Sequence, residues 1–146
     1  MEPSGQFILH IEDDEGSALL VQVALTEAGA NVRYRRVHDA RQALAYLDAA
    51  MKVESTTPKP DLILLDLNLP GNSGFEVLSA VRAAPFWAPT PVVVFTSSAA
   101  RHDMETASAL NATKYILKPS TFEGYLAMIK TLLGLLSPDG EGQPVD

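Results

Sequence analysis

Short apolar runs and longer segments with helical spacing alternate along the chain. Four runs are strand candidates because nearly all their residues are apolar, and they cover 7–11, 61–65, 91–95 and 114–117. Segment 31–37 alternates polar and apolar residues, as a half-exposed strand does. Helical spacing covers 15–28, 73–83, 101–110 and 122–136, and Asp39 can cap one more helix that carries Ala43, Leu44 and Leu47. The order is strand then helix, five times over.

The first helix is predicted in more detail. Its apolar residues Leu19, Leu20, Val23 and Leu25 share one broad side, which we expect to face the core. Gly29 then provides a C-terminal stop.

This alternation predicts an α/β fold, a doubly wound (βα)5 flavodoxin-like domain with a parallel sheet and helices on both faces. Five units are too few for an eightfold barrel. The strand order 2-1-3-4-5 is the natural choice, with the apolar runs 61–65 and 91–95 in central positions and the polar segment 31–37 at an edge. In this fold ligands bind at the carboxyl ends of the strands.

Composition limits the function without naming it. The 146 residues make one domain, expected at 7–136 between a polar tail at 1–6 and a flexible Pro/Gly-rich acidic tail at 137–146, which leaves no room for an output domain. The net charge of −7 disfavours nucleic acid and anionic membranes as partners. No cysteine is present to form disulfides or zinc-thiolate sites. Neither a secretion signal nor a long apolar run is found, so a cytoplasmic protein is expected.

Polar residues follow four of the predicted strands. They are Glu12, Asp13 and Asp14, then Asp66, then Thr96 and Ser97, and finally Lys118 and Pro119. Because the carboxyl ends of parallel strands meet at one edge, these side chains should converge. Carboxylates crowded together repel one another unless a cation lies between them, and an all-oxygen set favours Mg²⁺.

The same residues could support phosphoryl chemistry. Asp66, at the end of a central strand, would be the nucleophile, while Thr96 and Lys118 would contact the phosphoryl oxygens. Each residue also has an ordinary structural interpretation when taken alone. An acid after a strand is more often a helix cap or a turn residue, and Asp14 fits a cap better than a site. The joint placement favours the site.

The segments IEDD at 11–14, DLILLDLNLPGNSG at 61–74, VFTS at 94–97 and YILKP at 115–119 resemble the receiver domains of bacterial two-component response regulators. The resemblance covers roughly residues 7–136. It implies that Asp66 accepts a phosphoryl group from a sensor histidine kinase. It also implies that Glu12, Asp13 and Asp66 hold Mg²⁺ together with the backbone carbonyl of Asn68.

The resemblance assigns the remaining positions as well. Thr96 and Lys118 would contact the phosphoryl oxygens, and Tyr115 would be the aromatic switch that turns inward when Thr96 shifts. Without the family, an edge aromatic packed on the preceding helix is an equal interpretation of Tyr115. The peptide bond between Lys118 and Pro119 corresponds to one that is cis in the family. Such a protein carries out its own phosphotransfer and slow dephosphorylation but is otherwise no enzyme.

Three stretches narrow the resemblance. The loop at 52–60, FWAPTP at 86–91 and PSTFE at 119–123 look like those of stand-alone regulators that partner bacterial phytochromes. Those relatives commonly form homodimers through the surface of the fourth helix, fifth strand and fifth helix, here 101–110, 114–117 and 122–136. The last helix carries more apolar residues than one buried stripe needs, which indicates either such an interface or leucines that cover the sheet edge.

Other functions on related folds fit the residues less well. A dehalogenase-like phosphatase needs an acid two residues after the nucleophile, where this chain has Asn68. An FMN binder needs a Ser/Thr/Gly loop after the first strand, where this chain has three acids. A receiver that has lost phosphorylation would not be expected to keep the whole set of acids, threonine and lysine. His10, His38 and His102 lack ligand spacing and are interpreted as structural.

Overall fold

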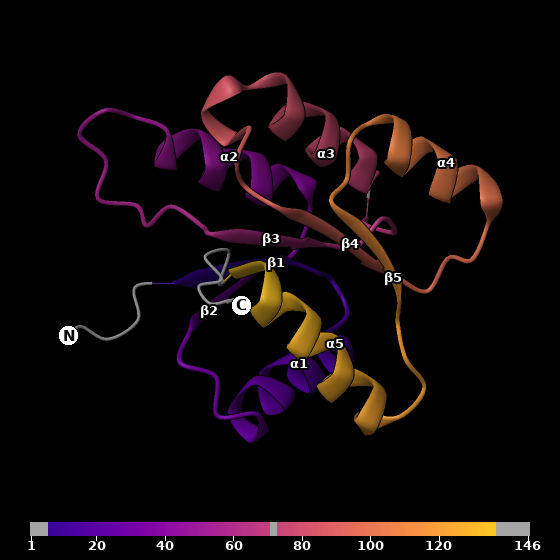
Figure 1. The fold of residues 1–146 in the computed structure, drawn as a ribbon. Coiled ribbons are helices and arrows are strands. Elements are labelled where there is room, and N and C mark those ends of the chain that lie inside the picture. Colours follow the sequence, from indigo (N-terminus) through magenta and orange to yellow (C-terminus); the bar gives the residue numbers. More distant parts are fainter. Residues whose placement is uncertain (1–5, 71–72, 137–146) are drawn as a thin grey trace, which may run out of the picture.

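The computed structural model describes residues 6–70 and 73–136, so the predicted tails lie outside the described residues except for Gln6. Strands and helices alternate along the chain (Figure 1). The strands are β1 (Phe7–Ile11), β2 (Arg33–Val37), β3 (Leu62–Leu65), β4 (Val92–Thr96) and β5 (Lys114–Leu117). The helices are α1 (Glu15–Glu27), α2 (Ala40–Ala50), α3 (Gly74–Ala83), α4 (Arg101–Ala109) and α5 (Phe122–Leu136), with a 3₁₀ turn, η1 (Pro85–Trp87), before β4.

All five strands pair in parallel in the order β2-β1-β3-β4-β5, which confirms the predicted fold class and strand order. Every residue of β1, β3 and β4 is buried, because helices cover both faces of the sheet. The polar strand β2 lies at one edge with alternating exposure, as its sequence predicted. The opposite edge is β5, which is only partly covered.

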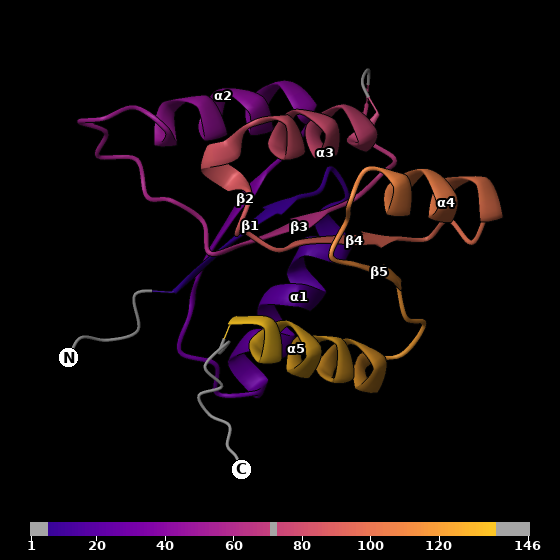
Figure 2. The same ribbon diagram turned by 45° about the horizontal axis from the view of Figure 1, so that its top comes forward.

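Helices lie on both faces of the sheet (Figure 2), with α2, α3 and α4 on one side and α1 and α5 on the other. One core cluster joins the sheet to α2 and α3 and includes Trp87 and Ala107. The second core cluster joins the sheet to α1 and α5. Leu135 and Leu136 pack into this second cluster, so the last two leucines of α5 contribute to the core rather than to an exposed face. None of the helices within the described ranges is long and apolar enough to cross a bilayer.

Local signals at the helix ends are confirmed. Asp14 caps α1 by accepting a hydrogen bond from the backbone N–H of Ser17 at 2.8 Å. Asp39 caps α2 in the same way through the N–H of Gln42. Gly29 follows the end of α1 with φ at +67°, a conformation that favours glycine.

The predicted core face of α1 is wrong in its main residues. Leu19, Leu20 and Val23 are exposed by 59%, 39% and 43%, and only Leu25 of the predicted set is buried. The face that contacts the core carries Ser17, Ala18, Val21, Ala24 and Leu25. Small side chains on that face let α1 lie close to the sheet and to α5, so the larger apolar side chains remain on the outer side.

Candidate functional site

The residues predicted to converge do lie together at the carboxyl ends of the strands. Glu12 and Asp13 follow β1, Asp66 follows β3, Thr96 ends β4 and Lys118 follows β5. Glu12, Asp66 and Thr96 are buried, Lys118 is half-buried and Asp13 is exposed. One carboxylate oxygen from each of the three acids lies within 4.8 Å of the others. The site is therefore a pocket with buried acids at its base and Asp13 at its mouth.

Lys118 connects the two buried acids. Its Nζ lies 3.0 Å from Oδ2 of Asp66 and 3.0 Å from Oε1 of Glu12, and it donates to Oε2 of Glu12 at 3.1 Å. The backbone N–H of Lys118 donates to the carbonyl of Thr96 at 2.8 Å, which ties the end of β5 to that of β4. This backbone bond fixes the point from which the lysine side chain reaches across the sheet.

Asp66 is held by the backbone around it. Its N–H donates to the carbonyl of Ile11, and its Oδ1 accepts the N–H of Asn68 at 3.1 Å. The Asn68 side chain donates to Oγ1 of Thr96 at 3.4 Å. The role of the Asn68 carbonyl as a metal ligand stays a prediction. Oδ1 and Oδ2 of Asp66 thus have different partners, one a backbone amide and the other a cation.

The peptide bond between Lys118 and Pro119 is trans, since none of the bonds in the described segments is cis. The predicted cis form was wrong. Trans is the intrinsically favoured isomer of an X–Pro bond, and Lys118 reaches both acids with the bond in that form.

The charges in the pocket shift one another's protonation. Burial would raise the pKa of Glu12, but hydrogen bonds with His10, Asp66 and Lys118 outweigh it and lower that pKa to about 2. Burial and the Glu12 carboxylate together raise the pKa of Asp66. Burial would lower the pKa of Lys118, but its bonds to the two acids raise it. One ammonium among three carboxylates leaves an excess of negative charge, which a further cation would relieve.

The donor set fits a hard divalent cation. Glu12, Asp13 and Asp66 offer only oxygen, and their ligand atoms already lie within the span of one coordination sphere. Arg36 of β2 holds the loop that presents the first two acids, because its guanidinium donates to the carbonyls of Glu12 at 2.8 Å and Asp13 at 2.9 Å. Sequence reasoning missed Arg36, since only the β1–β2 pairing places it beside this loop.

Thr96 and Tyr115 meet through a residue that the sequence did not single out. The N–H of Ser98 lies 3.4 Å from Oγ1 of Thr96, while the Tyr115 hydroxyl donates to the Ser98 carbonyl at 2.8 Å. Tyr115 is half-buried and packs against the core cluster that contains Ala107 of α4. Ser97 is exposed beside the pocket. The switch role of Tyr115 stays a prediction, and its connection to Thr96 runs through the backbone of one residue, Ser98.

The three histidines differ in their surroundings. His38 and His102 are exposed. His10 is fully buried in β1, two residues before Glu12, and its Nε2 lies 3.5 Å from Oε1 of that acid. Its interpretation as purely structural overlooked this neighbour, because a lone histidine in an apolar strand gives no spacing signal.

Comparison with known proteins identifies a sequence family and structural relatives. Residues 8–130 match the model of the response regulator receiver domain. The chain is 34% identical over 116 residues to the probable methanogenesis regulatory protein FilR2 of Methanothrix harundinacea. This alignment covers 80% of this chain and 74% of that protein. It is 32% identical over 123 residues to the response regulator Rcp1 of Synechocystis, in an alignment that covers 84% of this chain and 83% of Rcp1.

Solved structures agree with the sequence matches. The phosphorylated cyanobacterial phytochrome response regulator RcpA superposes with a TM-score of 0.81 at 30% identity, covering 91% of this chain and 94% of that one. The Mn²⁺-bound form of Rcp1 superposes with a TM-score of 0.78 at 30% identity, covering 88% of this chain and 92% of that one. The relative with a bound divalent cation supports the assignment of the acidic pocket to such an ion.

Proposed function

The chain belongs to the response regulator receiver domain family, and from this premise we propose that Asp66 accepts a phosphoryl group from the phosphohistidine of a sensor histidine kinase. The receiver is proposed to span 7–136. The observation that carries the proposal is the setting of Asp66: a buried carboxylate at the end of central strand β3, with Lys118 3.0 Å from one oxygen and the Asn68 N–H on the other.

The residues of the pocket divide the chemistry among them. An oxygen of Asp66 attacks phosphorus while the bond from phosphorus to the donor nitrogen breaks, so the histidine leaves and an acyl phosphate forms. A bound Mg²⁺ supplies neutralisation of the carboxylates and a contact for phosphoryl oxygen. Lys118 transfers its hydrogen bond from Asp66 to a phosphoryl oxygen, and the Thr96 hydroxyl donates to another. Attack by water later returns Asp66, a slow reaction that the chain itself catalyses.

Metal binding is assigned to particular residues in the same proposal. Asp13 and Asp66 are direct ligands, Glu12 is the buried third acid and the Asn68 carbonyl completes the protein ligands. Their carboxylate atoms lie close enough for one ion. Oxygen ligands at this separation suit Mg²⁺ or Mn²⁺.

The phosphoryl signal is proposed to leave through α4, β5 and α5. When the Thr96 hydroxyl moves toward the phosphoryl group, its contact with the Ser98 N–H changes. The Ser98 carbonyl holds the Tyr115 hydroxyl, so Tyr115 responds on the neighbouring strand. Phosphorylation therefore biases the position of a side chain on the surface of β5.

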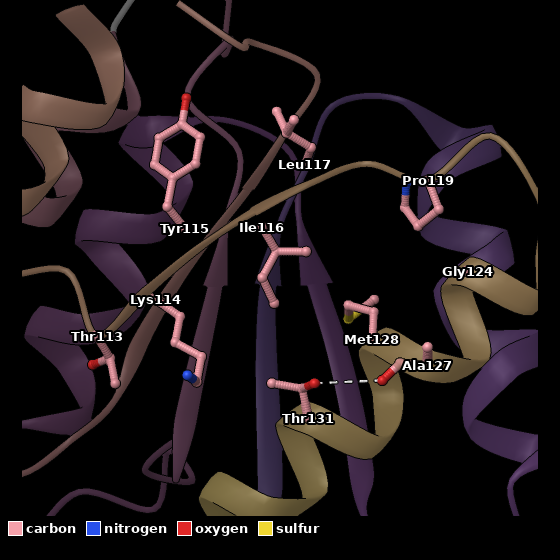
Figure 3. A pocket seen from close by; sticks show the side chains of 10 residues that line it. All are labelled: Thr113, Lys114, Tyr115, Ile116, Leu117, Pro119, Gly124, Ala127, Met128 and Thr131. Atoms are coloured by element: carbon pink, nitrogen blue, oxygen red, sulfur yellow. Dashed lines mark hydrogen bonds between the residues drawn. The ribbon is translucent and has the colours of Figure 1, made fainter. Parts of the chain in front are cut away.

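This surface is proposed to form a homodimer. A groove of about 700 Å³ runs between β5 and α5 and is lined by side chains from both (Figure 3). Leu117, exposed by 43%, lies at the edge strand, and Met128 lines the groove from α5. An uncovered edge strand with apolar neighbours supports burial against a second copy.

The names of two relatives support a choice of kinase partner. Rcp1 and RcpA, the latter named as a phytochrome response regulator, support a bacterial phytochrome with kinase activity as the donor. Transfer from such a kinase takes place in the cytoplasm. The charge of −7 supports a protein partner in place of nucleic acid or membrane.

Incubation with acetyl phosphate and Mg²⁺ tests the phosphoacceptor role. Intact mass spectrometry should show a gain of one phosphoryl group, and peptide mapping after trapping should place it on Asp66. Excess EDTA should prevent the gain, because the uncompensated carboxylates repel the anionic donor. Absence of any gain with Mg²⁺ would refute the proposal.

Leu117→Glu tests the dimer. We expect wild type to be a dimer by size-exclusion chromatography with light scattering in at least one of two conditions, before or after treatment with acetyl phosphate. The Leu117→Glu variant should be monomeric, because it places a charge in the surface that the dimer would bury. The matched control is Leu19→Glu, an exposed leucine on α1 away from β5, which should leave the dimer intact. A wild-type chain that stays monomeric in both conditions would contradict the proposed interface.

A further inference from the structure

His10 stands out as a polar side chain inside the core. It is fully buried in central strand β1, on the side of the sheet covered by α1 and α5. Its ring packs edge-on to Tyr34 at 5.7 Å and tilted to Phe95 at 6.5 Å, measured between ring centroids. This packing fixes the plane of the imidazole. Any polar contact that the ring makes is therefore rigidly directed.

Both ring nitrogens face polar groups. Nδ1 lies 2.6 Å from the hydroxyl of Tyr34 on β2, and Nε2 points to Oε1 of Glu12 at 3.5 Å. Nε2 has no hydrogen-bond partner within the usual distance among the described residues, although it is buried. A buried N–H without a partner is costly, so the Glu12 carboxylate is the group that relieves it.

The chemistry of the neighbours fixes the direction of each bond. The Glu12 carboxylate can only accept, so Nε2 carries the proton that it shares with Glu12. A neutral imidazole carries one N–H, so with that proton on Nε2 the Nδ1 atom is an acceptor. Tyr34 must then donate its hydroxyl hydrogen to Nδ1, and its oxygen remains available for the hydrogen bond with Gln22 of α1. The contacts from Gln22 to Tyr34, His10 and Glu12 thus place a donor toward an acceptor at every step from α1 to Glu12.

Lys118 alone cannot keep Glu12 in place. In the proposed function Lys118 turns from Asp66 to a phosphoryl oxygen, and this displacement weakens the only Lys or Arg contact that the Glu12 carboxylate has within the described residues. His10 does not take part in that movement, because it belongs to a central strand and its ring is held by two aromatic neighbours. With Nε2 of His10 3.5 Å from Oε1, Oε2 remains for the Asp14 N–H at 3.3 Å and for the cation.

From these contacts we propose that His10, oriented by Tyr34, is a positioning residue that holds the Glu12 carboxylate in place for the divalent cation. The inference rests on the proposed function for the role of the cation, but its observable is cation affinity itself. Groups that orient a metal ligand commonly change metal affinity about 10- to 100-fold when they are removed. Loss of the His10 N–H should therefore weaken cation binding, while the contacts of Asp66 with Lys118 and Asn68 remain as they are.

Two substitutions of similar length separate the donor from the packing. His10→Gln keeps an N–H near the position of Nε2, and His10→Met does not. The probe is Mn²⁺, and electron paramagnetic resonance measures the concentration of the unbound ion. His10→Met should raise the Kd for Mn²⁺ at least about tenfold, and His10→Gln should raise it by less than about threefold. The Mg²⁺ concentration for half-maximal phosphoryl uptake should rise with the Kd. Equal Mn²⁺ affinity in the two variants would overturn the proposal.

Further variants separate the proposed role of His10 from a general effect of a His→Met substitution and from a failure to fold. His102→Met, on exposed α4, is the matched control and should bind Mn²⁺ like wild type. If His10→Met does not fold by circular dichroism, Tyr34→Phe carries the test, with about threefold weaker binding expected and unchanged affinity overturning the proposal. Nitrogen NMR of wild type should show the proton of His10 on Nε2. A proton on Nδ1 would also overturn it.

The inference and the proposed function fail separately. If wild type takes up no phosphoryl group but Mn²⁺ affinity follows the His10 series, the proposed function is wrong and the positioning role stands. If wild type is phosphorylated but the series binds Mn²⁺ equally, the positioning role is wrong and the phosphoacceptor role stands.

Discussion

Asp66→Asn is expected to abolish phosphoryl uptake from acetyl phosphate, a loss of at least about 100-fold in rate that leaves no signal in intact mass. The amide oxygen is a far weaker nucleophile than a carboxylate and carries no negative charge toward phosphorus. The fold should survive, because the new side chain is the same size and its oxygen can still accept the Asn68 N–H.

Stability gives the same variant a second readout. Burial and Glu12 raise the pKa of Asp66, so its charge is unfavourable in the folded chain without a cation. Removal of that charge should leave the midpoint of urea unfolding unchanged or higher in EDTA. Asp48→Asn, at an exposed position of α2, is the control and should take up phosphoryl groups at the wild-type rate. Persistent uptake in Asp66→Asn would show that another residue is the acceptor.

Gly74→Ala is expected to destabilise the domain by about 3 kcal/mol, as overpacking against backbone does. A Cβ at Gly74 would lie 2.3 Å from the Asp66 carbonyl oxygen and 2.8 Å from Cα of Leu67. Both contacts are with backbone, which cannot swing aside like the end of a side chain. The Gly74 N–H also donates to the Leu67 carbonyl at 3.0 Å. Relief of the clash must displace the segment that carries Asp66.

Urea unfolding and the rate of phosphoryl uptake both measure this effect. The matched control is Gly134→Ala in α5, where an added Cβ meets nothing within 4 Å. That change should stabilise the domain by about 0.5–1 kcal/mol, the helix preference of alanine over glycine. Wild-type stability in Gly74→Ala would mean that α3 does not pack on the Asp66 segment as described.

The hydrophobic pattern determined much of the fold because the central strands are buried on both faces. Runs such as LILL in β3 have no exposed position, so they allow only an interior strand. The caps Asp14 and Asp39 act within one helical turn and need no tertiary information. The prediction of the core face of α1 was wrong because it followed the larger apolar side chains, such as Leu19 and Val23. Close packing against α5 instead selects the face with smaller side chains.

The site was predictable where it depended on strand order and unpredictable where it depended on strand register. Glu12, Asp66 and Lys118 each follow a strand, so the parallel order alone brings them to one edge. The proximity of His10 to Tyr34 and of Arg36 to the Glu12 loop depends on how β1 and β2 align residue by residue. A histidine in an apolar strand and a tyrosine in an alternating one were the only signals for the first pair.

The backbone of Ser98, which contacts Thr96 through its N–H and Tyr115 through its carbonyl, has a thermodynamic consequence. Because one residue makes both contacts, the proposed switch couples the phosphoryl site to the β5 surface in a single linked equilibrium. Linkage is reciprocal, so a partner that favours one position of Tyr115 must change the free energy of the phosphorylated state by the same amount that phosphorylation changes the partner's affinity. In the proposed switch, a bound partner is itself an effector of how readily Asp66 is phosphorylated.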